Sequence, residues 1–161
     1  MIQVEKISKS FETNDVIKDV SLNLERGKVN MIIGKSGAGK SVLLKCLVGL
    51  FDVDGGNIFY DERPFSEMGY QKKKEIRKEV GMLFQGSALF DSKTVLENVM
   101  FPLTIFSDRT PEEIKERALF CLRRVNIEEH ADSLYPAEIS GGMQKRVAIA
   151  RAIALQPRYL F

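Results

Sequence analysis

Apolar and polar residues alternate in two stretches within the first 25 positions. The apolar residues of these stretches are Ile2, Val4, Val20, Leu22 and Leu24. Because successive side chains of a strand point to opposite faces, the stretches predict two antiparallel strands with one solvated face. Residues 29–33 instead form a mostly apolar run that ends at Gly34, which predicts a buried parallel strand.

Helical and strand patterns follow one another after Gly34. Residues 41–48 carry an apolar stripe with helical spacing. Residues 57–60 and residues 80–84 are compact, mostly apolar runs that predict further strands. A helix flanked by such strands is typical of an α/β core.

Helix signals dominate the second half of the chain. Thr110 and Glu113 form a capping box with Pro111 between them, and apolar residues keep helical spacing as far as Val125. A second helix is predicted from Ser140 to about Leu155, followed by a strand from Arg158.

The predicted organisation is therefore a sheet core, a helical insert and a return to the core. The predicted segments are residues 1–86, 87–139 and 140–161.

Composition narrows the class of protein. A hydrophobic share of 44% and a net charge of +2 fit a globular domain and give no reason to expect a nucleic-acid partner. No apolar stretch is long enough to cross a bilayer, so work at a membrane would need another chain. Cys46 and Cys121 are expected to be reduced core thiols. The lysines at 72–74 are expected on a solvated helix face, and His130 is expected to be solvated without a catalytic role.

The strongest chemical signal matches the pattern G-x-x-x-x-G-K-[ST] between a predicted strand and a predicted helix. Glycines let successive backbone N–H groups face an anion, and the helix N-terminus adds a partial positive charge. Lys40 is a point charge for β- and γ-phosphates, and the Ser41 hydroxyl can ligate Mg²⁺. The loop comprises Gly34, Lys35, Ser36, Gly37, Ala38, Gly39, Lys40 and Ser41.

Three further features each allow two interpretations. The amide of Gln85 can reach Mg²⁺ or a water, although a polar residue at a strand end is ordinary. Ser140 before Gly141 and Gly142 is either a plain helix cap or part of an anion contact, since two glycines in a first turn cost stability. Phe11 is either a core aromatic or a platform for an adenine ring.

Together these motifs resemble the ATP-binding subunits of ABC transporters over the whole chain. Phe11, residues 34–41, Gln85 and residues 140–144 are similar to the A-loop, Walker A, Q-loop and signature motif of that family. The resemblance implies a P-loop NTPase fold, with a RecA-like α/β core, an N-terminal antiparallel β subdomain and an α-helical subdomain that carries the signature.

The resemblance also implies ligands and roles for particular residues. ATP and Mg²⁺ are the implied ligands, with Lys40 and Gln85 as catalytic residues, and Ser41 and Gln85 as the groups near the metal. Beyond the glycine-rich loop, the implied nucleotide contacts are Phe11, Val16, Ser140, Gly141, Gly142 and Met143.

Partners follow from the same resemblance. Two copies are expected to bind head to tail around two ATP molecules, at the cytoplasmic face of the inner or plasma membrane, beside a transmembrane permease. Residues 81–99 and Met143 look like the ATPases of MCE/Mla-type phospholipid transporters, which implies lipid transport and an MCE-type substrate-binding protein. ATPases of polar amino-acid importers share much of this region and are the alternative.

Other classes of the superfamily fit less well. Chromosome-maintenance and DNA-repair ATPases carry a long coiled coil between cradle and signature, whereas a hundred residues without sustained heptads separate Lys40 from Ser140. Ribosome-associated ABC proteins need a second set of motifs. The family's Asp and Glu that hold Mg²⁺ and activate water would follow Phe161, so we expect a truncated domain that binds nucleotide without turnover.

Overall fold

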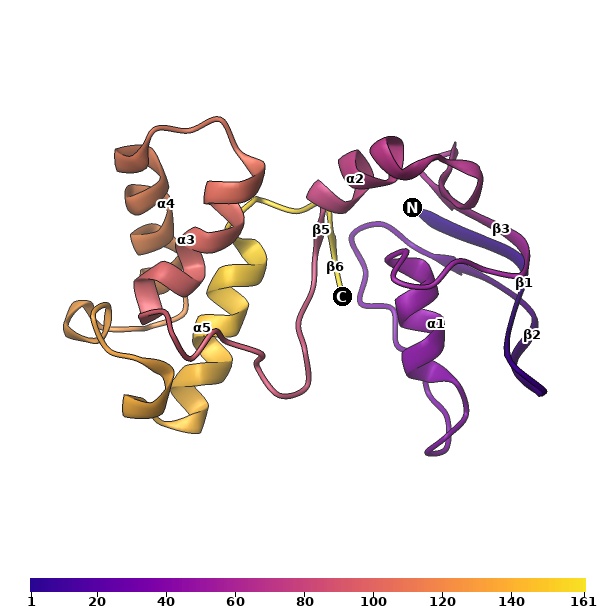
Figure 1. The fold of residues 1–161 in the computed structure, drawn as a ribbon, viewed down its shortest axis with the longest axis horizontal. Helices are drawn as coiled ribbons and strands as arrows, with labels where there is room; N and C mark the ends of the chain where they lie inside the picture. The colour runs from indigo at the N-terminus through magenta and orange to yellow at the C-terminus, as the bar shows by residue number, and fades with distance from the viewer. The chain divides into compact units, whose positions relative to one another are not determined.

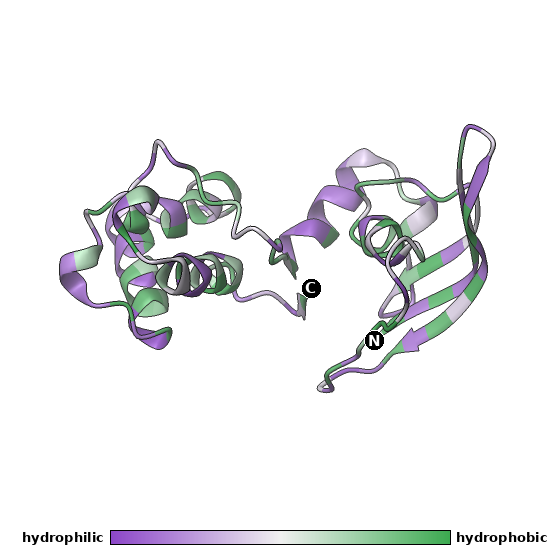
Figure 2. Ribbon diagram, turned by 90° about the horizontal axis from the view of Figure 1, so that it is seen from below, coloured by the Kyte–Doolittle hydropathy of each residue, from purple (hydrophilic) through white to green (hydrophobic).

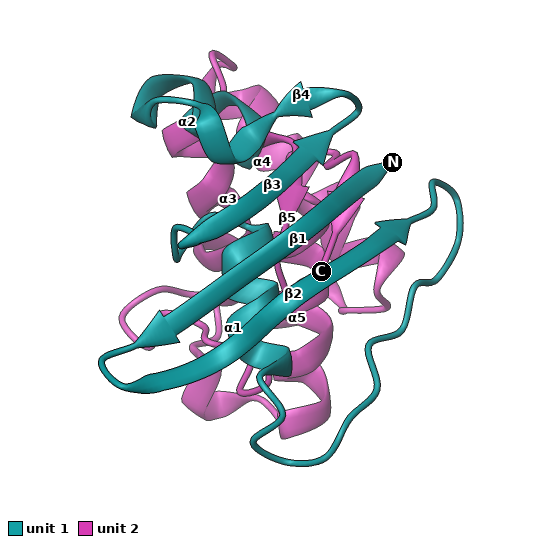
Figure 3. Cartoon of the chain, turned by 90° about the vertical axis from the view of Figure 1, so that its right-hand side faces the viewer, with its two compact units in different colours: residues 1–77 teal, residues 78–161 magenta.

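The computed structural model describes every residue from 1 to 161. Figure 1 gives the order of helices and strands along the chain. The chain divides into two compact units, residues 1–77 and residues 78–161, which have separate colours in Figure 3.

The first unit is built on an antiparallel sheet with the strand order β2-β1-β3-β4. Its strands are β1 (Ile2–Phe11), β2 (Asn14–Leu24), β3 (Gly55–Tyr60) and β4 (Arg63–Pro64). Ile2 lies opposite Leu24 and Val4 opposite Leu22, so the two alternating stretches pair as predicted. Figure 2 shows hydrophobic and hydrophilic residues in bands along these strands.

Helix α1 (Lys40–Leu47) confirms the helix predicted after the glycine-rich loop. It buries Leu43, Cys46 and Leu47. Tyr60 of β3 is fully buried and its hydroxyl donates to the Leu47 carbonyl oxygen at 2.8 Å. This bond ties the C-terminal end of α1 to the sheet.

A short 3₁₀ helix, η1 (Phe65–Glu67), and helix α2 (Tyr70–Lys78) follow the sheet. The prediction of a solvated lysine face is wrong at Lys73, whose side chain is only 13% exposed. Its ammonium lies 2.6 Å from the Asp52 carboxylate and 5.8 Å from the centre of the Phe65 ring. The hydrogen bond from Lys73 holds the pKa of Asp52 below its ordinary value.

Residues 29–33 are not the buried parallel strand that their apolar pattern predicts. They lie in no sheet, and Val29, Met31 and Ile33 are 93%, 77% and 85% exposed. A parallel strand exists only through hydrogen bonds to a neighbour, and no strand of residues 1–161 pairs with this run. Apolar composition alone therefore could not decide its structure.

The second unit contains three helices and a short parallel strand pair. The helices are α3 (Val95–Phe106), α4 (Pro111–Arg124) and α5 (Gly141–Ile153), and two 3₁₀ helices, η2 (Glu129–Ala131) and η3 (Pro136–Glu138), lie between α4 and α5. The capping box predicted at Thr110 and Glu113 is present, with Pro111 in the first turn. An equivalent box of Thr94 and Glu97 begins α3, a helix that the periodicity did not predict.

The strand pair joins two distant parts of the chain. β5 (Val80–Gly81) runs parallel to β6 (Tyr159–Leu160), which confirms a strand after Arg158. A strand through residue 84 is wrong, because the pairing ends where Leu83 N–H donates to the Phe161 carbonyl and Phe84 is 48% exposed.

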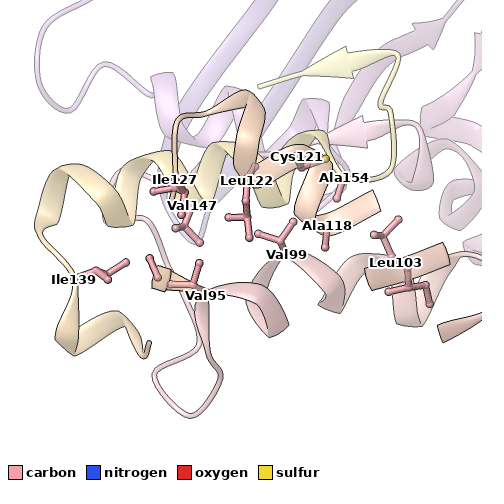
Figure 4. Close-up of a cluster of buried hydrophobic side chains, with 13 residues drawn as sticks. Val95, Val99, Leu103, Ala118, Cys121, Leu122, Ile127, Ile139, Val147 and Ala154 are labelled. Atoms are coloured by element: carbon pink, nitrogen blue, oxygen red, sulfur yellow. The ribbon is translucent and has the colours of Figure 1, made fainter. Parts of the chain in front are cut away.

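The core of the second unit lies where α3, α4 and α5 pack together (Figure 4). Its fully buried side chains include Val99, Leu103, Leu122 and Val147. Cys46 and Cys121 are free, buried thiols, as expected, and burial raises the pKa of both. Among the helices of residues 1–161, none is long and apolar enough to span a membrane.

Replacing a core leucine should destabilise the second unit. Leu103→Ala removes a fully buried side chain, and we expect the free energy of unfolding to fall by about 2–5 kcal/mol. Ile105→Ala, two residues away on α3 and 52% exposed, is the control and should change it by about 0.5 kcal/mol or less. Urea unfolding followed by circular dichroism measures both variants, and equal losses of unfolding free energy would contradict this core.

Candidate functional site

The glycine-rich loop depends on glycine at its last turn before α1. Gly37 and Gly39 have φ angles of 78° and 82°, in the left-handed region that side chains disfavour. A Cβ on Gly39 would also lie 3.0 Å from the Val16 carbonyl oxygen and 3.2 Å from its side chain. Strand β2 therefore leaves little room beside Gly39 at Val16, a residue that the resemblance names as a nucleotide contact.

The start of α1 differs from the starts of α3, α4 and α5. Thr94, Thr110 and Ser140 each accept a backbone N–H bond at the N-termini of α3, α4 and α5. At α1 the N-cap is Gly39, which supplies no side-chain acceptor, and no acidic residue stands in the first turn. Its N–H groups and partial positive charge are thus left for an anion.

Lys40 places an ammonium group beside the same loop. Its Nζ donates to the carbonyl oxygens of Gly34 at 2.7 Å and Lys35 at 2.8 Å. The side chain therefore folds back along the loop. The next residue, Ser41, has an exposed side chain in the first turn of α1. An ammonium, a hydroxyl and free N–H groups together suit an anion with several oxygens.

A cavity of about 140 Å³ lies beside the loop. Its walls include Val16 from β2, Ala38 and Lys40 from the loop, and Leu43 from α1. Phe11 does not line it. The Phe11 ring is 39% exposed and packs edge-on against Phe51, with 5.2 Å between ring centres.

In the second unit, Gln85 is exposed in a turn closed by a bond from Ser87 N–H to the Phe84 carbonyl. Ser87 and Ala88 follow with φ angles of 62° and 48°. Two adjacent non-glycine residues in this region cost about 1–3 kcal/mol each, so the surroundings must hold them.

Two residues that the sequence analysis missed hold this segment. Arg151 of α5 donates to the carbonyl oxygens of Ala88 at 2.7 Å and Ser87 at 2.8 Å. Burial lowers the pKa of its guanidinium. The fully buried Asn98 accepts from the Phe90 N–H at 2.8 Å and donates to the Phe90 and Lys93 carbonyls. Asn98 could have been noticed in the sequence, because it is a polar residue at a core position of an apolar run. No residue near Arg151 in the chain indicates its role.

No neighbouring atom within the chain requires glycine at the two positions that begin α5. Ser140 caps the helix by accepting from the Met143 N–H at 3.2 Å. A Cβ on Gly141 would meet nothing within 4 Å, and one on Gly142 only the Ser140 hydroxyl at 3.9 Å. Neither glycine has a positive φ. Their open backbone is suited to close approach by another molecule.

The predicted site residues thus form two groups. The first unit carries Phe11, Val16 and residues 34–41, and the second carries Gln85 and residues 140–143. His130 is exposed beside Glu128, as expected.

Comparison with known proteins gives matches over most of the chain. The family described as "ABC transporter" matches residues 17–161. The methionine import ATP-binding protein MetN of Clostridioides difficile (strain 630) is 41% identical over 160 residues, which cover 99% of this chain and 49% of MetN. The L-cystine import ATP-binding protein TcyC of Bacillus subtilis (strain 168) is 38% identical over 163 residues, covering 99% of this chain and 66% of TcyC.

A solved structure is similar over the same length. It is the dimeric post-hydrolysis state of the ATP-binding cassette MJ0796 bound to ADP and Pi, with 32% identity and a TM-score of 0.89. The match covers 99% of this chain and 72% of that one. The chain spans about half the length of the MetN relative.

The contact between β2 and the loop gives a testable difference between two glycines. Gly37→Ala should cost about 1 kcal/mol of unfolding free energy, because only its positive φ opposes a side chain. Gly39→Ala should cost more, because its new Cβ also meets Val16. Urea unfolding without nucleotide measures both variants. Equal losses would show that Val16 does not constrain the loop.

Proposed function

We propose that this chain, which belongs to the ABC transporter family, is the ATP-binding part of a transport ATPase. Its α/β fold is that of ABC ATPase cassettes, as the sequence analysis expected. The uncapped N-terminus of α1, with Lys40 beside it, carries the proposal, because it leaves N–H groups and a cation for a phosphate chain.

The loop residues fit a nucleoside triphosphate with Mg²⁺. Backbone N–H groups of residues 37–41 would bind phosphate oxygens, and Lys40 would exchange its bonds to Gly34 and Lys35 for bonds to the β- and γ-phosphates. The Ser41 hydroxyl would hold Mg²⁺, which neutralises phosphate charge, and the amide of Gln85 is of the chemical type that binds such an ion or its water. Phe11 and Val16 would contact the adenine side of the nucleotide.

Hydrolysis of the bound nucleotide is the second part of this proposal. Lys40 would stabilise charge on the transferred phosphate, and Gln85 would orient the attacking water. We propose that residues 1–86 form the β subdomain and the first part of the core, residues 87–139 the helical subdomain, and residues 140–161 the signature helix and the start of the next core strand. Helix α5 packs against α3 and α4, so it shares the hydrophobic core of the helical subdomain.

A second copy would complete each nucleotide site. Ser140, Gly141, Gly142 and Met143 would meet the γ-phosphate held by the other copy, head to tail. The open backbone at both glycines supports this, since nothing within the chain requires it. The similar cassette MJ0796 forms a dimer with ADP and Pi, which supports the same arrangement.

The remaining partner would be a transmembrane permease, which would hold the protein at the cytoplasmic face of a membrane. Phe90 is 40% exposed, and its ring centre lies 4.5 Å from that of the half-buried Phe101. Phe90 lies shortly after Gln85 in the chain, and Phe101 lies on α3. Together the two rings would bind a short permease helix. Leu89, next to Phe90 in the chain, packs against the core of the second unit and is not part of this surface.

For the transported substrate, amino-acid import is better supported than lipid transport. The names of MetN and TcyC describe import of methionine and of L-cystine, and each match covers 99% of this chain. Neither MetN nor TcyC supports an MCE-type partner. We therefore propose a polar or sulfur-containing amino acid as the substrate class, in place of the phospholipid that residues 81–99 suggested.

Nucleotide binding should depend on Lys40. In Lys40→Ala we expect the affinity for Mg·ATP to fall about 10–100-fold, the effect of losing charge-assisted hydrogen bonds. Lys45→Ala, in the last turn of the same helix, is the matched control and should bind as wild type. Titration of each variant with a fluorescent ATP analogue measures both affinities. Unchanged affinity in Lys40→Ala would remove the basis of the proposed function.

Substrate uptake should separate the two transport classes. In cells that lack this protein, we expect uptake of labelled methionine or cystine to fall and to return with wild type but not with Lys40→Ala. Lipid composition of the membrane leaflets should stay unchanged. Normal amino-acid uptake together with altered lipid distribution would favour the phospholipid alternative.

A further inference from the structure

We propose that Arg151 is a positioning residue that locks the segment of Gln85 to the helix of Ser140, so that both motifs of the second unit move as one body. The segment comprises residues 85–90, and the helix is α5. The proposal rests on the proposed function, because it concerns how those two motifs are placed for ATP.

The contact between α5 and the segment depends on the guanidinium group of Arg151. Two of its nitrogens donate to successive carbonyl oxygens, those of Ser87 at 2.8 Å and Ala88 at 2.7 Å. Its central carbon also lies 5.8 Å from the centre of the Phe90 ring. A planar group with several fixed donors can hold two carbonyls and an aromatic face together, which lysine cannot do.

The segment needs such a clamp. Ser87 and Ala88 both have left-handed backbone, although neither is glycine, and Ser87 is buried. Left-handed backbone in adjacent non-glycine residues persists only when other contacts fix it. The two carbonyls that Arg151 binds belong to these two residues, so the clamp acts at the strained point.

Asn98 of α3 fixes the other end of the segment. It holds both the N–H and the carbonyl of Phe90, and it is fully buried. Helices α3 and α5 share one core, so both anchors stand on the same packed body. In Figure 1 the loop between β5 and α3 passes beside α5, which agrees with the Arg151 bonds.

Arg151 would therefore couple the position of Gln85 to the position of α5. A displacement of Gln85 caused by nucleotide would be transmitted through Ser87 and Arg151 to α5, and hence to Ser140 at its start. Without the guanidinium, the segment would relax from its left-handed backbone and Gln85 would lose its fixed position. ATP would still bind at Lys40, which lies in the first unit.

The chain provides a matched control in Arg117. It also donates to two carbonyl oxygens, those of Ala154 at 3.0 Å and Ile153 at 3.1 Å, and lies 5.1 Å from the Phe120 ring centre. It therefore has the same chemistry at the C-terminal end of α5, but it does not touch residues 85–90. Arg117→Met and Arg151→Met should lose comparable stability.

Two measurements, of ATP hydrolysis and of amide hydrogen exchange, test the role of Arg151. We expect Arg151→Met to lower kcat for ATP hydrolysis at least tenfold with KM unchanged within threefold, whereas Arg117→Met stays within twofold in both. Arg151→Lys should recover part of the loss. Amide hydrogen exchange of residues 85–90 should rise at least tenfold in Arg151→Met alone.

The outcomes distinguish a positioning role of Arg151 from a purely stabilising one. Equal kcat and equal exchange in Arg151→Met and Arg117→Met would overturn the proposal and leave Arg151 a stabilising residue. If wild type neither binds nor hydrolyses ATP, the proposed function fails, and the exchange of residues 85–90 still tests whether Arg151 holds them. If Arg151→Met does not fold, the comparison of Arg151→Lys with Arg117→Lys by the same two measurements decides.

Discussion

The unpaired N–H groups at the start of α1 are the constraint on which the rest of the site depends. Every helix must satisfy these groups somehow, and α3, α4 and α5 do so with Thr94, Thr110 and Ser140. Helix α1 has Gly39 at the same place. A side chain there is disfavoured by the positive φ and by the closeness of Val16, so strand β2 favours glycine at this helix end.

A second constraint acts in the other unit, where strained backbone is held by side chains from two helices. Ser87 and Ala88 would not adopt left-handed backbone unaided, and their carbonyls are bound by Arg151. The buried Asn98 fixes Phe90 next to them. Strain of this kind concentrates at sites that must keep one geometry, which agrees with the place of Gln85 just before it.

Local signals let the sequence predict much of this structure. The glycine-rich loop, the capping box at Thr110 and the cap at Ser140 depend on residues within a few positions, and all three lie where predicted. The run at residues 29–33 failed because a strand needs a partner that its own composition cannot reveal. Arg151 was missed for the same reason, since its acceptors lie more than sixty residues away in the chain.

The proposed phosphate site at the start of α1 is tested most directly by a crystal structure of the protein with Mg²⁺ and a non-hydrolysable ATP analogue. The account predicts phosphate oxygens within hydrogen-bond distance of the N–H groups of residues 37–41. It also predicts that Lys40 Nζ has left the carbonyls of Gly34 and Lys35 for the phosphates. A nucleotide bound elsewhere, with both Lys40 bonds intact, would contradict it.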